Sequence, residues 1–191
     1  MTVLILGLLI FLGAHSVRIV ADPWRSAQIA CMGEKRWKGL VSLVSLAGFA
    51  LIVWGYGQTR GDAALWNPPV WLNHLASLLT VPAFVLLVAA YVPGNRIKTA
   101  VGHPMVAAVK LWAFAHLICN SRPGDLLLFG TFLAWAIVDF VSARRRDRAA
   151  GTRYPAGPGW HDALVVGIGL VAWVAFAMWG HSWLIGVAPF A

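Results

Sequence analysis

Apolar residues gather in long unbroken stretches along this chain, and short segments rich in charge, glycine and proline separate them. A helix needs about 18 to 20 mostly apolar residues to cross the roughly 30 Å hydrocarbon layer of a membrane. Six stretches are expected as such helices, at about Val3–Val20, Gly39–Tyr56, Val70–Val92, Gly102–Cys119, Leu126–Ser142 and Ala163–Val187. Because they do not alternate with period two, helices are favoured over barrel strands. The pattern predicts an all-α integral membrane protein with a six-transmembrane-helix bundle.

Basic residues are distributed unevenly between the connecting segments. Lys and Arg gather at 18–38, 96–98 and 144–153, whereas the other two connections hold only Arg60 and Arg122. Because segments rich in Lys and Arg stay in the cytoplasm, both termini are expected outside, in the periplasm. No Lys or Arg precedes the first stretch, so it is expected as a retained anchor rather than a cleaved signal. The expected location is the bacterial inner (cytoplasmic) membrane, crossed several times.

Composition agrees with this picture, since 60% of the residues are hydrophobic against roughly 45–50% in soluble domains. The net charge of +8 comes mainly from the basic connections, which are expected to lie against anionic lipid headgroups, so no nucleic-acid partner is implied. The run ARRRDRAAGTR at 143–153 is expected to be a solvated loop that fixes the topology. The whole chain, 1–191, is expected to form one transmembrane domain.

The histidines divide by expected depth. The cytoplasmic side receives His15, His103 and His161, and the outer side receives His74, His116 and His181. A six-coordinate b-type haem needs two imidazoles from facing helices, and an ionisable residue inside a span is a functional-site hypothesis by default. For His74, His161 and His181, a place near the lipid headgroups explains the residue without any ligand. For His15 and His116, the alternative to metal ligation is a hydrogen bond to a neighbouring carbonyl.

Residues 101–120, VGHPMVAAVKLWAFAHLICN, place two histidines and a lysine on an apolar helix. His103 and Lys110 share one face, whereas His116 lies about 140° around the helix and about 20 Å further along it. His103 and His116 therefore cannot chelate one ion together. Lys110 either extends toward a membrane boundary, pairs with a carboxylate such as Asp139, or attracts an anionic group such as a propionate or phosphate.

Several common sites are absent from the sequence. It contains no phosphate-binding P-loop, no GxSxG elbow, no HExxH helix and no CxxC pair. Cys31 and Cys119 are expected on opposite sides of the membrane, too far apart for a disulfide. The residues by themselves indicate a bundle with buried histidines.

Two blocks of sequence resemble the NnrU family. They are GAHSVRIVADPWR with the following GEKRWKGLVSLVSLAGFALIVWGY, and GHPMVAAVKLWAFAHLICNSRPGDLLLFGTFLAWAIVDFVSARRRDR. The family includes the haem-containing zeta-carotene isomerase, which isomerises a cis double bond of a carotenoid. The resemblance implies a b-type haem whose iron is ligated by the residues that correspond to His15 and His116, with His103 and Pro104 matching an HP motif. His15 and His103 lie closer in expected depth, so His103 is kept as the alternative partner of His15.

The candidate cofactor-binding residues are His15, His116, His103, Lys110 and Arg18, with His15 and His116 as the metal ligands and no catalytic residue assigned. Three functions remain open. The first is a haem-dependent cis-trans isomerase of a lipid-soluble polyene or isoprenoid. The second is a non-enzymatic accessory or sensor protein in denitrification and nitric oxide metabolism, as associated with NnrU proteins. The third is a membrane methyltransferase that binds S-adenosylmethionine near His103, because isoprenylcysteine carboxyl methyltransferases share an HP motif.

The expected partners follow from these functions. They are membrane lipid and either a lipid-soluble small molecule or nitric oxide. A homo-oligomer or a redox partner is left open.

Overall fold

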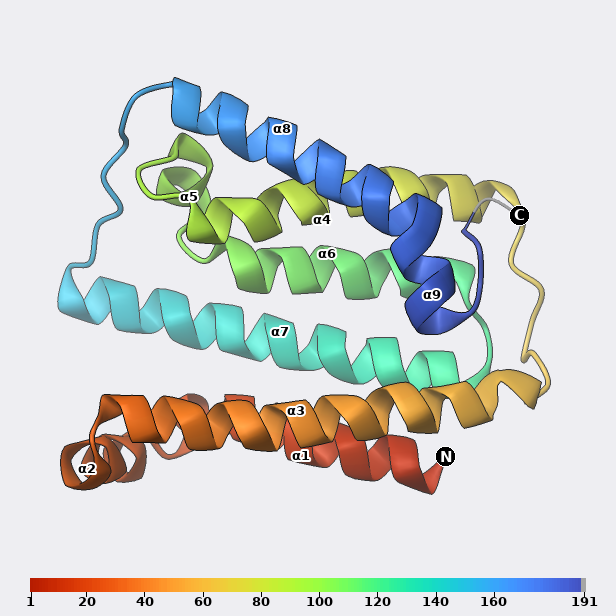
Figure 1. Cartoon of the computed structure of the whole chain (residues 1–191), viewed down its shortest axis with the longest axis horizontal. Coiled ribbons are helices and arrows are strands. Elements are labelled where there is room, and N and C mark those ends of the chain that lie inside the picture. The colour runs from red at the N-terminus through yellow and green to blue at the C-terminus, as the bar shows by residue number, and fades with distance from the viewer. Residues whose placement is uncertain (190–191) are drawn as a thin grey trace. The chain divides into compact units, whose positions relative to one another are not determined.

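A computed structural model describes residues 1–189, and these residues contain no β-strand. Helices follow one another along the chain (Figure 1). In chain order they are α1 (Thr2–Val20), α2 (Asp22–Met32), α3 (Glu34–Gln58), the 3₁₀ turn η1 (Thr59–Gly61), α4 (Trp71–Tyr91), α5 (Arg96–Val101), α6 (Pro104–Cys119), α7 (Pro123–Ala150), α8 (Trp160–Ala175), the π-helical turn η2 (Phe176–Gly180) and α9 (His181–Ile185). The all-α class predicted from the sequence is confirmed.

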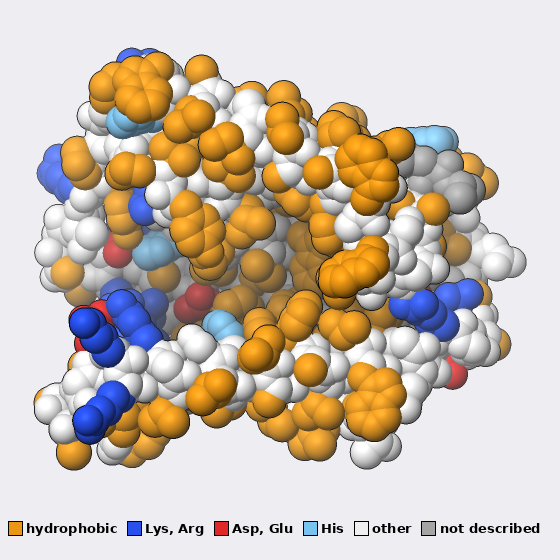
Figure 2. Space-filling view, viewed as in Figure 1, with side chains coloured by type: hydrophobic (Ala, Val, Ile, Leu, Met, Phe, Trp, Pro, Cys, Tyr) orange, Lys and Arg blue, Asp and Glu red, His pale blue; other side chains and the backbone are white. Residues whose placement is uncertain are grey.

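Within residues 1–189, five helical segments are long and apolar enough to cross a membrane: α1, α3 with η1, α4, α7, and α8 continued through α9. They indicate a multi-pass membrane protein, and hydrophobic side chains cover much of the visible helical surface (Figure 2). The remaining apolar helix, α6, has 16 residues. At 1.5 Å per residue it is about 24 Å long, short of the roughly 30 Å hydrocarbon layer. The predicted count of six spans and the side of the termini therefore stay predictions.

The basic run at 143–153 differs from its prediction, because most of it is helical rather than a loop. Helix α7 continues through the arginines to Ala150 and has 28 residues. Ala and Arg favour helices, and cations stabilise the last turn, where the helix dipole is negative. Two short helices, α2 and α5, likewise occupy segments that were expected as plain connections.

The chain divides into two compact units, which are described separately. The first comprises Met1–Leu65 with Arg122–Thr131, and the second comprises Trp66–Ser121 with residues 132–189. The boundary falls inside α7. The single domain expected over 1–191 stays a prediction, and its last two residues lie outside the described ones.

In the first unit, glycines let α1 and α3 approach closely. A Cβ atom at Gly7 would lie 2.6 Å from the backbone nitrogen of Ile52, and one at Gly48 would lie 2.8 Å from that of Phe11. Leu4 and Leu8 are buried beside this contact, at 0% and 4% exposure. Small residues at helix interfaces are typical of membrane proteins, where close packing replaces the hydrophobic effect between helices.

A buried carboxylate joins the end of α3 to the start of α7. Asp125, 5% exposed, accepts hydrogen bonds from the Tyr56 hydroxyl at 2.7 Å and from the Arg122 backbone N–H at 2.9 Å. The second bond satisfies a donor at the start of α7, as the third helical residue does in a capping box. The first unit thus satisfies this buried carboxylate with its own donors.

In the second unit, α4 packs against α6 and α8. A Cβ atom at Gly169 of α8 would lie 2.8 Å from the Val85 Cα atom of α4. The Trp173 indole N–H donates to the Thr80 hydroxyl at 2.9 Å. Asn95, 1% exposed, donates to the Ala89 carbonyl at 2.9 Å, and its side-chain oxygen caps α5. These contacts hold α8 and α5 on α4.

Substitution of Gly7 by Ala should destabilise the first unit. The added Cβ must displace backbone atoms of α3, and overpacking of this kind costs about 1–3 kcal/mol. Gly13→Ala is the matched control, because a Cβ there meets nothing within 4 Å. Thermal unfolding in detergent should give a lower midpoint for Gly7→Ala only. Equal midpoints would contradict the close packing of α1 on α3.

Candidate functional site

His15 lies on α1 and is exposed. Its Nδ1 lies 2.7 Å from the Phe11 carbonyl oxygen, one turn earlier, and its ring stacks on the Phe11 ring with centroids 4.4 Å apart. Because a carbonyl oxygen only accepts, Nδ1 must carry the proton. In the neutral imidazole the lone pair is then on Nε2, the form in which a histidine coordinates a metal.

His116 repeats this arrangement on α6. It is partly buried, and its Nδ1 donates to the Trp112 carbonyl oxygen at 2.8 Å, again one turn earlier. The Trp112 ring lies 5.4 Å from the His116 ring. The carbonyl bond that the sequence offered as an alternative to metal ligation is therefore present at His15 and at His116. It uses Nδ1, whereas ligation would use Nε2, so the bond is compatible with either role.

His181 lies beside His116 in the second unit. The two imidazole rings are nearly parallel, at 17°, with centroids 6.5 Å apart. His181 Nδ1 donates to the Val187 carbonyl oxygen at 2.7 Å, which again places the lone pair on Nε2. At metal–nitrogen bonds of about 2.0 Å, two nitrogens on opposite sides of one metal ion lie roughly 4 Å apart, which puts their ring centres roughly 6 Å apart. The sequence placed both histidines near the outer side, but it explained His181 as an interfacial residue.

A π-helical turn separates α8 from α9, the short helix that begins at His181. This turn, η2, runs from Phe176 to Gly180, where a Cβ would lie 2.7 Å from the Phe176 ring. Turns of this type occur frequently at functional sites. Nothing in the apolar periodicity signals such a turn, which explains why the sequence did not pair the two histidines.

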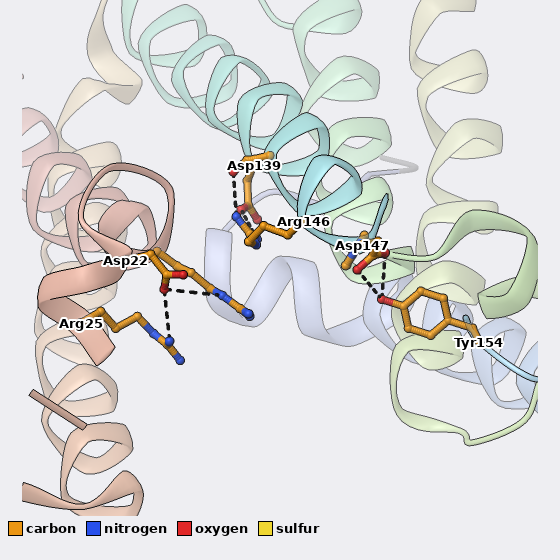
Figure 3. A network of polar contacts seen from close by, with 9 residues as sticks. Asp22, Arg25, Asp139, Arg146, Asp147 and Tyr154 are labelled. Atoms are coloured by element: carbon orange, nitrogen blue, oxygen red, sulfur yellow. Dashed lines mark hydrogen bonds and ion pairs between the residues drawn. The ribbon is translucent and has the colours of Figure 1, made fainter. Parts of the chain in front are cut away.

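His103 has a different kind of partner. Its Nε2 lies 2.8 Å from Asp147 Oδ2 on α7, and the Tyr154 hydroxyl donates to the same oxygen at 3.1 Å (Figure 3). The side chains of His103 and Asp147 are 23% and 13% exposed. A carboxylate that orients an imidazole is a common supporting contact, and here it occupies Nε2. The sequence missed this cluster, because Asp147 lies 44 residues from His103.

Lys110 and His103 both contact Phe140, in agreement with the face they were expected to share. Lys110 Nζ lies 3.7 Å from the centroid of the Phe140 ring, and the ring of His103 lies 6.4 Å from it. Asp139 Oδ1 lies 4.0 Å from Arg146 Nη2 (Figure 3). The position of the Lys110 ammonium group over the Phe140 ring is a favourable contact in an apolar setting, because the face of an aromatic ring attracts a cation.

Arg18 lies in the last turn of α1, and its Nε is 4.0 Å from Asp22 Oδ1. In the first unit, an apolar pocket of about 240 Å³ runs beside α1, lined by Ile5, Leu8, Leu9, Leu12, Gly13, Ser16, Leu127 and Thr131. His15 follows Leu8 by seven residues, so both lie on one face of α1. His15 itself does not line the pocket, whereas its chain neighbour Ser16 does.

No group of three or more His, Cys, Asp or Glu side chains within residues 1–189 could hold a metal ion. A centre ligated by protein alone would need three or four such residues. Haem needs only two protein ligands, because the porphyrin supplies the other four. His15 belongs to the first unit and His116 and His103 to the second, so the choice of partner for His15 stays a prediction.

The chain matches the model of a protein family. Its description is NnrU protein, and the match covers residues 3–189. No curated protein and no solved structure matches the chain.

Replacement of His103 by Ala should loosen the segment after α7. Asp147 would keep only the Tyr154 hydroxyl, and loss of a hydrogen bond to a charged group costs about 1.5–3 kcal/mol. The measurement is the rate of trypsin cleavage after Arg153, together with the unfolding midpoint. His74→Ala, at an exposed histidine of α4, is the control. Cleavage as slow as in the unchanged protein would contradict the role given to this contact.

Proposed function

The chain belongs to the NnrU family, and we propose that it binds b-type haem through imidazoles of different helices, with His116 and His15 as the iron ligands. One observation carries the proposal: each of these imidazoles donates Nδ1–H to the carbonyl one turn earlier. Such a bond fixes the ring and raises the basicity of the other nitrogen. The resemblance to zeta-carotene isomerase supports the same pair.

His181 is the second candidate partner of His116. Its ring lies parallel to that of His116 at 6.5 Å, and it has the same tautomer. His103 is less suited than His181, because Asp147 occupies its Nε2 and only Nδ1 would remain for a metal. The residues that would hold haem are thus His116 with either His15 or His181, and His116 is common to both pairs.

The proposed activity is a haem-dependent cis-trans isomerisation of a lipid-soluble polyene or isoprenoid. Haem held by these imidazoles would supply a redox-active Lewis acid for this chemistry. The apolar pocket beside α1 would hold one segment of such a hydrocarbon, since its lining is mainly aliphatic and includes only two hydroxyl side chains, Ser16 and Thr131. An apolar lining with few polar groups is typical of sites for such ligands.

The proposed setting is the bacterial inner membrane, crossed six times, with both termini in the periplasm. Helix α6 would be the sixth span, and α5 would extend its cytoplasmic end. The distribution of Lys and Arg supports this orientation. Fusion of alkaline phosphatase to the C-terminus should give an active enzyme, whereas fusion of green fluorescent protein should stay dark. The opposite pair of results would place the C-terminus in the cytoplasm.

The haem proposal is tested first by optical spectroscopy. The detergent-purified protein, oxidised and then reduced with dithionite, should give a six-coordinate b-type spectrum with about one haem per chain. His116→Ala and His15→Ala should each lose haem, as measured by the pyridine haemochrome assay. His74→Ala is the matched control and should keep it.

The pattern of loss identifies the second ligand. If His116→Ala and His181→Ala lose haem while His15→Ala keeps it, the second iron ligand is His181 and not His15. Full haem occupancy in both His15→Ala and His116→Ala would contradict the proposed ligands. A colourless protein that cannot be reconstituted with haem would contradict the whole proposal and favour an accessory role in nitric oxide metabolism.

A further inference from the structure

A small basic pocket lies at the C-terminal end of α7, apart from the proposed haem ligands in the sequence and within the second unit. Its volume is about 170 Å³, and its lining residues are Arg144, Asp147, Arg148, Gly151, Thr152 and Arg153. Sites for drug-sized ligands usually measure roughly 300–1,000 Å³. The pocket therefore suits a single small group.

The end of α7 folds back to form this pocket. Gly151 has a φ of +64°, and the Thr152 N–H donates to the Asp147 carbonyl at 2.9 Å. A left-handed glycine followed by this longer bond is the Schellman motif, which closes the helix and reverses the chain. The reversal brings Arg153 back beside Arg148 on the last turn.

The side chain of Arg144 lies against a glycine of the neighbouring turn. Gly102, between α5 and α6, has a φ of +78°, and Arg144 Nη1 occupies the space 2.5 Å from where a Cβ would be. Any larger residue at 102 would displace the guanidinium group. The glycine thus leaves room for the Arg144 guanidinium group beside the turn.

The single carboxylate of the lining is already engaged. Asp147 Oδ2 accepts from His103 and from Tyr154, whose hydroxyl meets it in Figure 3. Within residues 1–189, no carboxylate lies within 4.0 Å of the three lining arginines. The lining carries a formal charge of about +2, and the helix C-terminus offsets only about half a unit of it.

We propose that this pocket binds a phosphate monoester dianion. Such a group carries about −1.5 to −2 charges at pH 7, which matches the lining better than a phosphodiester with one charge. Guanidinium groups form paired hydrogen bonds with phosphate oxygens, and the Thr152 hydroxyl adds a donor. The segment is predicted at the cytoplasmic membrane surface, where it meets both lipid headgroups and the solution. The phosphate group can therefore belong to a lipid headgroup or to a soluble molecule.

The same basic run supplies matched controls. Arg146 donates to the Ser142 hydroxyl at 2.7 Å and faces Asp139, whereas Arg145 is exposed, and neither lines the pocket. Arg145→Gln removes one charge from the run without touching the lining. Arg148→Gln and Arg153→Gln each remove one lining charge and no internal ion pair.

The experiment measures the thermal unfolding midpoint of the full chain against two probes. One arm titrates glycerol phosphate into detergent-solubilised protein at constant ionic strength, with chloride as the reference anion. The other arm compares nanodiscs of phosphatidylcholine with nanodiscs that contain phosphatidic acid. We expect the midpoint to rise in at least one arm, and the apparent affinity to fall about tenfold or more in Arg148→Gln and Arg153→Gln but not in Arg145→Gln.

A rise of the unfolding midpoint in both arms would show that the phosphate monoester alone is sufficient for binding. A rise with phosphatidic acid alone would assign the site to a lipid headgroup. No rise in either arm overturns the proposal. An equal loss of apparent affinity in Arg145→Gln and in the two lining variants would also overturn the proposal, because it would indicate general attraction between charges. Since the readout does not involve haem, its outcome is independent of the haem proposal.

Discussion

Hydrocarbon offers no hydrogen-bond partner, so a polar group on an apolar helix is costly unless the protein itself supplies a partner. His15 and His116 meet this requirement through the carbonyl of the preceding turn. The bond requires only the spacing that every α-helix provides, but it fixes the imidazole and its tautomer. The hydrogen bond that satisfies Nδ1 therefore also places the lone pair on Nε2, the nitrogen that would bind a ligand.

Packing between the helices follows from the same constraint. With lipid as apolar as the side chains, close contact stabilises neighbouring helices where burial from water cannot. Gly7 and Gly48 bring α1 against the backbone of α3, and Gly169 brings α8 against α4. The remaining surface can then be broadly hydrophobic, as Figure 2 shows for one face. Such a surface is ordinary in lipid, although it would be a liability in water.

The sequence predicted the helical class and the approximate place of each apolar helix, because continuous hydrophobicity is a property of the residues alone. It missed the continuation of α7 to Ala150, since length and hydropathy set the expected end and helix propensity was not weighed against them. For the site, it singled out His15, His103 and His116, but it could not find Asp147 or set His181 beside His116. Those contacts depend on tertiary approach and on an irregular turn, which local patterns do not encode.

Three irregular points of the helices lie next to residues with candidate chemical roles. The π-helical turn precedes His181, the left-handed Gly102 precedes His103, and the left-handed Gly151 closes the arginine pocket. A regular helix repeats its side-chain directions every 3.6 residues, so it can present a polar group to a partner only where that repeat allows. A break in the helix releases this restriction for the next few residues. His15 and His116 lie within regular helix and use its repeat, whereas the arginine pocket and the alternative ligand His181 depend on such breaks.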